Sequence, residues 1–279
     1  MPVKFSIPIV FLFLVSCHSE SKSPVVNVLG TKGNFLADSS KQRMLKIIEG
    51  GWVNEEYISA FRETFSPMAA ATHGLPRQQM AFDISNINGD TVINAMGRLN
   101  YHEGERFDVV FYLRTDGKTG MKIKEDRNQL DESLLLNYSI EGKDTILLLT
   151  INDGEKTVTN RFRNQFREFP ETDDVHLTAM EYFVNKNLFE GNWKMSGQTI
   201  SFSGDGRVKN FHAYKRYSVS TVEENPTSRP DEISFYNDST EVTYAFTFNH
   251  QRIQLYEIKE STDALKFSRG KMIGELERE

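Results

Sequence analysis

The sequence predicts a mainly β protein made of two antiparallel barrels joined by a short helix. Three observations support this: apolar and polar residues alternate over many short segments, one short frame occurs twice, and a helix-like stretch separates its two copies. The 279 residues are 38% hydrophobic and 26% charged, which is a globular balance. Aromatic residues reach 11%, mostly Phe and Tyr, and this favours strands.

Residues 1–17, MPVKFSIPIVFLFLVSC, have the features of an N-terminal address signal. One cation precedes an apolar run that is too short to span a bilayer as a helix but suits the core of a signal peptide. The run ends in Leu14-Val15-Ser16-Cys17, which resembles the lipobox of bacterial lipoproteins. The resemblance implies removal of signal peptide 1–16 and attachment of a diacylglyceryl group to the sulfur of Cys17. The alternative is an ordinary secretory signal followed by a chance cysteine.

The lipobox resemblance also implies an address in the bacterial cell envelope, with the lipid anchor binding the membrane. His18, directly after the anchored cysteine, favours the outer membrane and leaves the periplasmic or surface side open. Cys17 is the only cysteine, so no thiol would remain for disulfides, metal binding or nucleophilic catalysis. A net charge of −6 without a basic cluster argues against a nucleic-acid partner.

Residues 17–40 are rich in Ser, Gly and short polar residues, and we expect them to tether the lipid to the fold. Residues 41–169 are predicted to form the first barrel. A short helix with apolar residues on one side precedes strands of period two, which are separated by turn signals such as Asn88-Gly89-Asp90. Strands joined in sequence by short turns form a meander, and closure into a barrel removes its exposed edges.

Residues 170–187 are predicted to form a linker helix, and residues 188–279 the second barrel. Pro170 and the acidic residues after it indicate a helix start, and apolar residues follow at helical spacing. A second meander comes next. In its clearest strand every second residue is apolar: Val242, Tyr244, Phe246 and Phe248.

The repeated frame contains both tryptophans of the chain. Ile47-Ile48-Glu49-Gly50-Gly51-Trp52 matches Leu188-Phe189-Glu190-Gly191-Asn192-Trp193 position by position. Gly-x-Trp at the start of a meander resembles the lipocalin and wider calycin group. The resemblance implies eight-stranded barrels in which Gly50 and Gly191 let the backbone turn tightly, while Trp52 and Trp193 close the floor.

The same resemblance implies a basic residue of the last strand packed across each tryptophan ring. By position this would be Arg163, or its neighbour Arg161, in the first barrel and Arg278 in the second. The Thr-Asp-Tyr motif of the kernel lipocalins is absent from both halves, so calycin-like describes the expected fold better. A single larger β-sandwich with a helical insert is the alternative.

The sequence lacks three common catalytic or nucleotide-binding patterns. It has no Gly-x-Ser-x-Gly elbow, no phosphate loop and no dinucleotide fingerprint. Its six histidines show no recognised metal-ligand spacing. We therefore expect a protein that is not an enzyme, with no catalytic residue, no metal and no cofactor.

An eight-stranded barrel is either filled by its side chains or holds one small ligand, and an apolar interior suits an apolar or aromatic molecule. The candidate ligand-binding residues are inward-facing aromatics and one loop histidine: His73, Phe107, Phe111, Tyr138, Tyr244, Phe246 and Phe248. A packed core is the alternative for the aromatics. We expect loop 66–78 to form a lid over the first barrel.

The leading functional hypothesis is a membrane-anchored envelope lipoprotein that binds a small apolar ligand without catalysis. One alternative is a scaffold or accessory subunit of an envelope protein complex, which predicts an exposed apolar patch for a protein partner. The other is a barrel-mouth isomerase or hydrolase, which predicts a buried carboxylate or histidine with a perturbed pKa inside a barrel.

Overall fold

The structure is a computed structural model, and the statements below concern the residues that it describes. These are residues 39–71, 78–85, 87–89, 91–98, 105–115, 118–124, 134–152, 154–168, 177–221, 229–260 and 266–279. The expected signal peptide, the lipidation site Cys17, nearly all of the expected tether and the candidate His73 lie outside them. In the described part of the chain, no helix is both long enough and apolar enough to cross a membrane.

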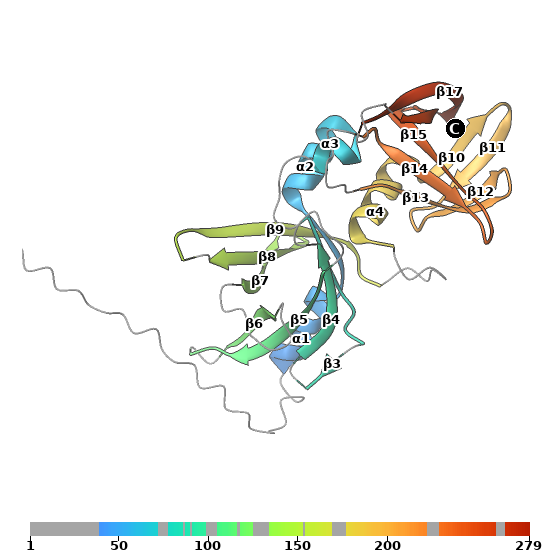
Figure 1. The fold of residues 1–279 in the computed structure, drawn as a ribbon. Coiled ribbons are helices and arrows are strands. Elements are labelled where there is room, and N and C mark those ends of the chain that lie inside the picture. The colour runs from blue at the N-terminus through green and yellow to red at the C-terminus, as the bar shows by residue number, and fades with distance from the viewer. Residues whose placement is uncertain are drawn as a thin grey trace, which may run out of the picture. The chain divides into compact units, whose positions relative to one another are not determined.

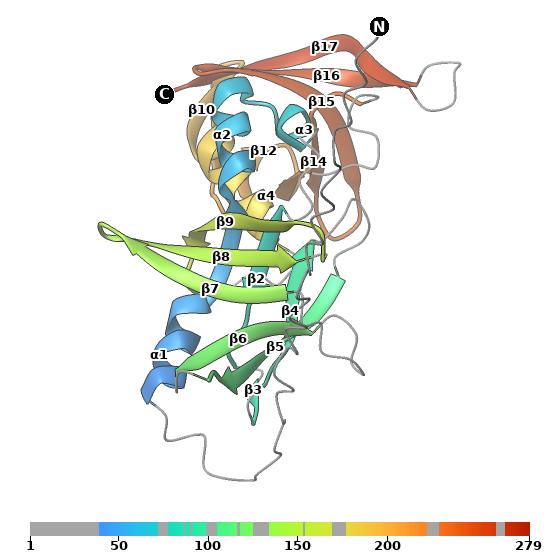
Figure 2. The ribbon, with the colours of Figure 1, turned by 90° about the vertical axis from the view of Figure 1, so that its left-hand side faces the viewer.

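Nine antiparallel strands form the first sheet, in the order β2-β1-β9-β8-β7-β6-β5-β4-β3. Strand β2 also pairs with β4, so the pairings of eight strands complete a circuit, and β3 forms a small hairpin with β4. Figure 2 shows β9, β8 and β7 side by side. The strands are β1 Gly50–Asn54, β2 Gln79–Phe82, β3 Ile87–Asn88, β4 Thr91–Arg98, β5 Glu105–Leu113, β6 Thr119–Lys124, β7 Leu134–Glu141, β8 Asp144–Asn152 and β9 Thr157–Phe166.

Eight further strands close into a second barrel, in which each strand pairs with the next and β17 pairs with β10. In Figure 1 these strands are coloured from yellow to red. The strands are β10 Gly191–Met195, β11 Gln198–Phe202, β12 Arg207–Phe211, β13 Tyr214–Val219, β14 Glu232–Tyr236, β15 Glu241–Asn249, β16 Arg252–Glu260 and β17 Phe267–Arg278. The predicted fold class, mainly β with two calycin-like antiparallel barrels and a connecting helix, is confirmed.

Each barrel has helices next to its first strand in the chain. They are α1 Ser39–Ile48, α2 Glu55–Thr64, α3 Pro67–Ala71, α4 Ala179–Val184 and the π-helix η2 Asn185–Phe189. Helix α1 leads into β1, and α4 with η2 leads into β10. The connecting helix begins after the N-cap Thr178, whose side chain accepts a hydrogen bond from the backbone N–H of Glu181. Helices α2 and α3 lie between β1 and β2 in the chain.

The described residues form two hydrophobic cores. One contains α1, Trp52 and the inner faces of the first sheet. The other contains Trp193, the inner faces of the second barrel, α4 and η2, together with residues of α2 and α3. Residues 55–71 therefore belong in sequence to the first predicted domain, but they pack in the core of the second.

The helix α2 is absent from the expectations above, although its sequence carries a signal for it. Asn54 is an N-cap whose side chain accepts from the backbone N–H of Glu56, and the buried residues Tyr57, Ile58 and Phe61 have helical spacing.

The expected lid over the first barrel is wrong for residues 66–71. Residues 67–71 form helix α3 and Ser66 directly precedes it; Asp231 of the second barrel accepts hydrogen bonds from Ser66 and Met68 at the start of this helix.

Candidate functional site

Each tryptophan is fixed by the same set of contacts at the floor of its barrel. Trp52 and Trp193 are fully buried. The indole Nε1 of Trp52 donates to the carbonyl of Ile48 at 2.7 Å, and that of Trp193 donates to the carbonyl of Phe189 at 2.6 Å. Both carbonyls belong to the last residue of the preceding helix, where no intrahelical donor remains. The ring therefore closes the floor and also caps the helix that leads into the barrel.

An arginine lies over each ring and binds the same helix. Arg278 is 4.7 Å from the Trp193 ring centroid, as expected, and its Nη2 donates to the carbonyl of Leu188. The expectation for the first barrel, Arg163 or Arg161, is wrong. Arg167 lies over Trp52 at 5.8 Å and donates to the carbonyls of Lys46 and Ile47.

Strand alternation explains this correction. Phe162 on β9 is fully buried, so its neighbours Arg161 and Arg163 are on the opposite, outer face of the strand. Arg167 follows the end of β9, where the chain passes the helix end. Position along the sequence therefore predicted the wrong arginine. The cation that reaches the Trp52 ring must lie on the inner side of the sheet or beyond its end, as Arg167 does.

The first glycine of each frame has a backbone conformation that other residues rarely adopt. Gly50 has φ +100° and Gly191 has φ +124°. A Cβ on Gly50 would lie 2.0 Å from the carbonyl oxygen of Phe166, whereas a Cβ on Gly191 would meet nothing within 4 Å. Backbone conformation therefore requires glycine at both positions, and close packing adds a second requirement at Gly50.

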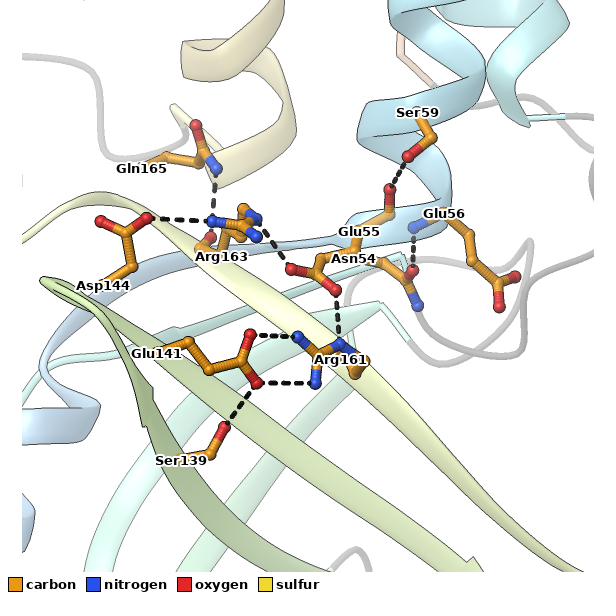
Figure 3. Close-up of polar contacts among 10 residues, drawn as sticks. All are labelled: Asn54, Glu55, Glu56, Ser59, Ser139, Glu141, Asp144, Arg161, Arg163 and Gln165. Atoms are coloured by element: carbon orange, nitrogen blue, oxygen red, sulfur yellow. Dashed lines mark hydrogen bonds and ion pairs between the residues drawn. The ribbon is translucent and has the colours of Figure 1, made fainter.

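Glu55 connects the start of α2 to the outer face of β9 (Figure 3). Its carboxylate is 2.6 Å from Arg161 Nε and 2.7 Å from Arg163 Nε. Arg161 also forms a two-pronged pair with Glu141, and Arg163 pairs with Asp144. The hydrogen bond from Arg161 lowers the pKa of Glu141. Because the arginines are satisfied by carboxylates of this chain, the network is a brace for α2 rather than an anion site.

The far end of α2 contacts the second barrel. Phe65 lies against Phe248 and His250, with ring centroids 5.6 and 4.4 Å apart. Immediately after it, Ser66 Oγ and the backbone N–H of Met68 donate to Asp231 Oδ1 at 2.9 and 3.0 Å. The candidate residue Phe248 is therefore part of this helix contact rather than of a ligand site.

Aromatic rings fill the second barrel from its floor upward. Phe189 of η2 contacts Phe202, Tyr217 and the candidate Phe246, with ring centroids 5.3 to 5.7 Å apart. Phe202 contacts Phe235 at 6.2 Å, and Phe235 in turn contacts Phe211 at 4.2 Å. The candidate Phe246 is thus a core residue, as the packed-core alternative states.

The open end of this barrel, opposite the helices, is less tightly covered. Four apolar side chains there are half-buried and pack against the core: Met195, Tyr214, Val242 and Tyr244. The rings of Tyr214 and Tyr244 each lie 6.2 Å from Phe235. Burial, together with the proximity of Tyr214, raises the pKa of Tyr244. The Tyr244 hydroxyl therefore stays neutral near pH 7, and it makes no hydrogen bond to the described residues.

The candidates of the first barrel lie in its core. Phe107 and Phe111 are buried, and Tyr138 is half-buried against the same cluster. Lys41 of α1 is buried beside them, with its Nζ 5.6 Å from the Phe111 ring centroid and donating to the carbonyl of Gly89. Phe111 is therefore covered by α1 at the floor, where a ligand would have to displace the helix.

Two carboxylates beside the second barrel have raised pKa values, and both are held by neighbouring groups. The described residues contain no group of three or more His, Cys, Asp or Glu side chains that could hold a metal ion. Burial raises the pKa of Asp231 and of its neighbour Glu232. Asp231, however, is bonded to the start of α3, and Glu232 pairs with Arg229 at 3.5 Å.

Comparison of the chain with protein-family models, curated proteins and solved structures finds no match.

Proposed function

We propose that the chain is a lipid-anchored, non-catalytic binding protein of a bacterial envelope, which takes a small apolar ligand at the open end of its second barrel. The observation that carries the proposal is the half-buried set Met195, Tyr214, Val242 and Tyr244, which rests on a floor of fully packed rings. Apolar side chains with a few converging polar groups are typical of small-molecule sites. The lipobox-like sequence at Cys17 supports the anchor.

The packed rings define what such a site accepts. Because Phe211 and Phe235 fill the interior below the two tyrosines, the ligand lies across the mouth rather than deep in the barrel. Rings of this kind favour a flat, ring-containing molecule, since aromatic pairs contribute about 0.5–1.5 kcal/mol beyond the area that they bury. The neutral Tyr244 hydroxyl supplies one hydrogen bond for a polar group on that molecule.

A fluorescence titration with N-phenyl-1-naphthylamine, a neutral aromatic dye, tests the proposal on the acyl-free mature chain. Tyr214→Ala and Tyr244→Ala are each expected to weaken dye binding about tenfold, or about 1.4 kcal/mol. The control Ile140→Ala removes an exposed apolar side chain of the first sheet and should leave binding unchanged. Absence of dye binding, or equal binding by the tyrosine variants, would refute the site.

The anchor has a separate test. Labelling with radioactive palmitate in a lipoprotein-processing host should mark the wild-type chain and leave Cys17→Ala unlabelled. A Cys17→Ala variant that still incorporates the label would contradict the anchor while leaving the binding site unaffected.

The scaffold alternative is favoured by one observation. Met272 and Ile273 on β17 are 50% and 42% exposed, although both are large and apolar. Successive residues of a strand point to opposite faces, so the two side chains offer separate contact points, and exposed apolar side chains of this kind occur in protein interfaces. Pull-down from detergent-solubilised host membranes with wild type and with a Met272→Ser, Ile273→Ser double variant tests it: a partner that is retained only by the wild type supports a subunit role, and recovery of the chain alone contradicts it.

A further inference from the structure

The strand β17 has a long free edge. One side of the strand pairs with β16 along almost its whole length. On the other side, β10 pairs only with Glu277 and Arg278, at the end of β17. Within the described part of the chain, no strand pairs with this side between Phe267 and Leu276. In Figure 2, β17 is the uppermost strand of the second barrel, with β16 and β15 below it. An unpaired strand edge of this kind is a template for pairing with another strand.

Two large apolar side chains lie within the free edge. Met272 and Ile273 are exposed, and neither belongs to the two hydrophobic cores of the described residues. Edges that avoid other chains usually carry charged residues or proline instead. A strand laid along this edge would contact side chains on both faces of β17 at once. The edge therefore offers apolar contacts in addition to backbone hydrogen bonds.

The charges along the edge change sign at its centre. Arg269 and Lys271 precede Met272, whereas Glu275 and Glu277 follow it. If two copies of this strand pair antiparallel, the basic half of each copy lies along the acidic half of the other, and opposite charges face one another. Parallel pairing would place like charges side by side. The edge is therefore complementary to itself about a two-fold axis, as an isologous dimer requires.

The charged groups have capacity for such contacts. Arg269 and Lys271 are exposed, and neither forms an ion pair within the described residues. Glu275 accepts a hydrogen bond from Gln254 at 2.7 Å and lies 3.4 Å from Arg252, and both partners belong to β16 on the paired side of β17. An ionised carboxylate has about four acceptor sites, so Glu275 can accept from a further cation.

We propose that the chain forms a two-fold symmetric dimer in which the free edges of two β17 strands pair antiparallel, with the axis at Met272. This register pairs residues 269–275 of each copy and stops before Glu277, where β10 occupies the edge. It places Arg269 of one copy opposite Glu275 of the other. The dimer requires neither the proposed ligand site nor the lipid anchor.

The same register brings two further contacts. Lys271 is diagonal to Glu275 of the second copy, a distance that long side chains span. Met272 meets its own counterpart at the axis. A single pair of short strand edges buries less area than a standard-size interface, so we expect an affinity at the micromolar end of the usual range.

Cations and bulges can also protect an edge from pairing. The pairing of β17 with β16 does shift register near Met272 and near Arg269. Two features of this edge nevertheless differ from protection. The cations occupy only one half of it, with carboxylates in the other half, and its exposed apolar residues stand at the centre, where a paired strand is closest. Self-pairing accounts for both features.

Sedimentation velocity of the acyl-free mature chain, over a concentration series in the micromolar range, tests the dimer. The wild type should show a monomer–dimer equilibrium that weakens in 1 M NaCl. The double variant Arg269→Glu, Lys271→Glu and the variant Glu275→Lys should each weaken self-association at least about tenfold, because like charges then face one another. Mixing the two variants restores opposite charges across the axis and should recover a dimer. The control Lys209→Glu reverses an exposed cation on β12 and should associate like the wild type.

A wild type that stays monomeric, or unchanged association in both charge variants, would overturn the proposal, as would failure of the mixture to recover the dimer. If either charge variant does not fold, cross-linking decides the question. Met272→Cys in a Cys17→Ala chain should form a disulfide-linked dimer on oxidation, because paired Cα atoms at the axis lie about 4.5–5.5 Å apart. Leu113→Cys, at an exposed apolar position of β5, should not. Equal cross-linking of both variants contradicts the dimer, and so does a monomeric wild type that retains a different protein through Met272 and Ile273.

Discussion

Replacing Trp193 by Ala removes the floor of the second barrel and tests whether the repeated frame is architectural. The side chain is fully buried, so the cavity and lost transfer free energy should cost about 3–5 kcal/mol. Loss of the Nε1 donor leaves the Phe189 carbonyl without its partner, which adds about 1 kcal/mol, and loss of the Arg278 contact adds about 0.5–1 kcal/mol. The total, about 4.5–7 kcal/mol, approaches the entire stability of many domains.

Urea denaturation followed by far-UV circular dichroism measures this loss. With a slope of about 2 kcal/mol per molar urea, Trp193→Ala should lower the unfolding midpoint of the second barrel by about 2–3.5 M or abolish its cooperative unfolding. Trp193→Phe keeps a ring but not the donor, and it should cost about 1–2 kcal/mol. Because Trp52 is then the only tryptophan, its fluorescence reports the first barrel alone. The control Ile273→Ala, at a partly exposed position, should stay within about 0.5 kcal/mol of wild type.

The reasoning fails if Trp193→Ala unfolds cooperatively at the wild-type midpoint and loses only ligand binding. Trp193 would then be a binding residue rather than the floor. The corresponding variant of the first barrel, Trp52→Ala, should likewise lose the fold of that barrel, because its indole and Arg167 make the same contacts.

Two further predictions concern the frame and the brace of α2. Gly50→Ala should destabilise the chain more than Gly191→Ala in urea denaturation. Both substitutions introduce backbone strain of about 1–3 kcal/mol, but only a Cβ at Gly50 also meets the Phe166 carbonyl. Equal losses of stability in the two variants would contradict the packing argument. Glu55→Gln should cost about 0.5–1 kcal/mol at low salt and less in 1 M NaCl, where charges are screened within about 3 Å. Its neighbour Glu56→Gln should change little, and an equal, salt-independent loss in both variants would argue against the network.

The candidate site was only partly predictable from the sequence. Tyr244 was found because alternation along its strand places it on the inner face with Phe246 and Phe248. Met195 and Tyr214 were missed, since they lie beside turns where alternation gives no signal. Only the closed barrel shows how far each residue lies from the floor. Phe246 is in the core, Phe248 contacts the end of α2, and Tyr244 borders the mouth.

The sequence by itself determined the strands of period two and the two copies of the frame, and the resemblance of the frame indicated the need for glycine at Gly50 and Gly191. These depend on local properties, namely the period-two pattern of apolar residues and the backbone angles of one residue. Only the tertiary structure decided that Arg167 covers Trp52 and that α2 and α3 join the second core. The reason is that such contacts join residues distant in sequence, and strand register and side-chain packing place them without leaving a periodic trace in either segment.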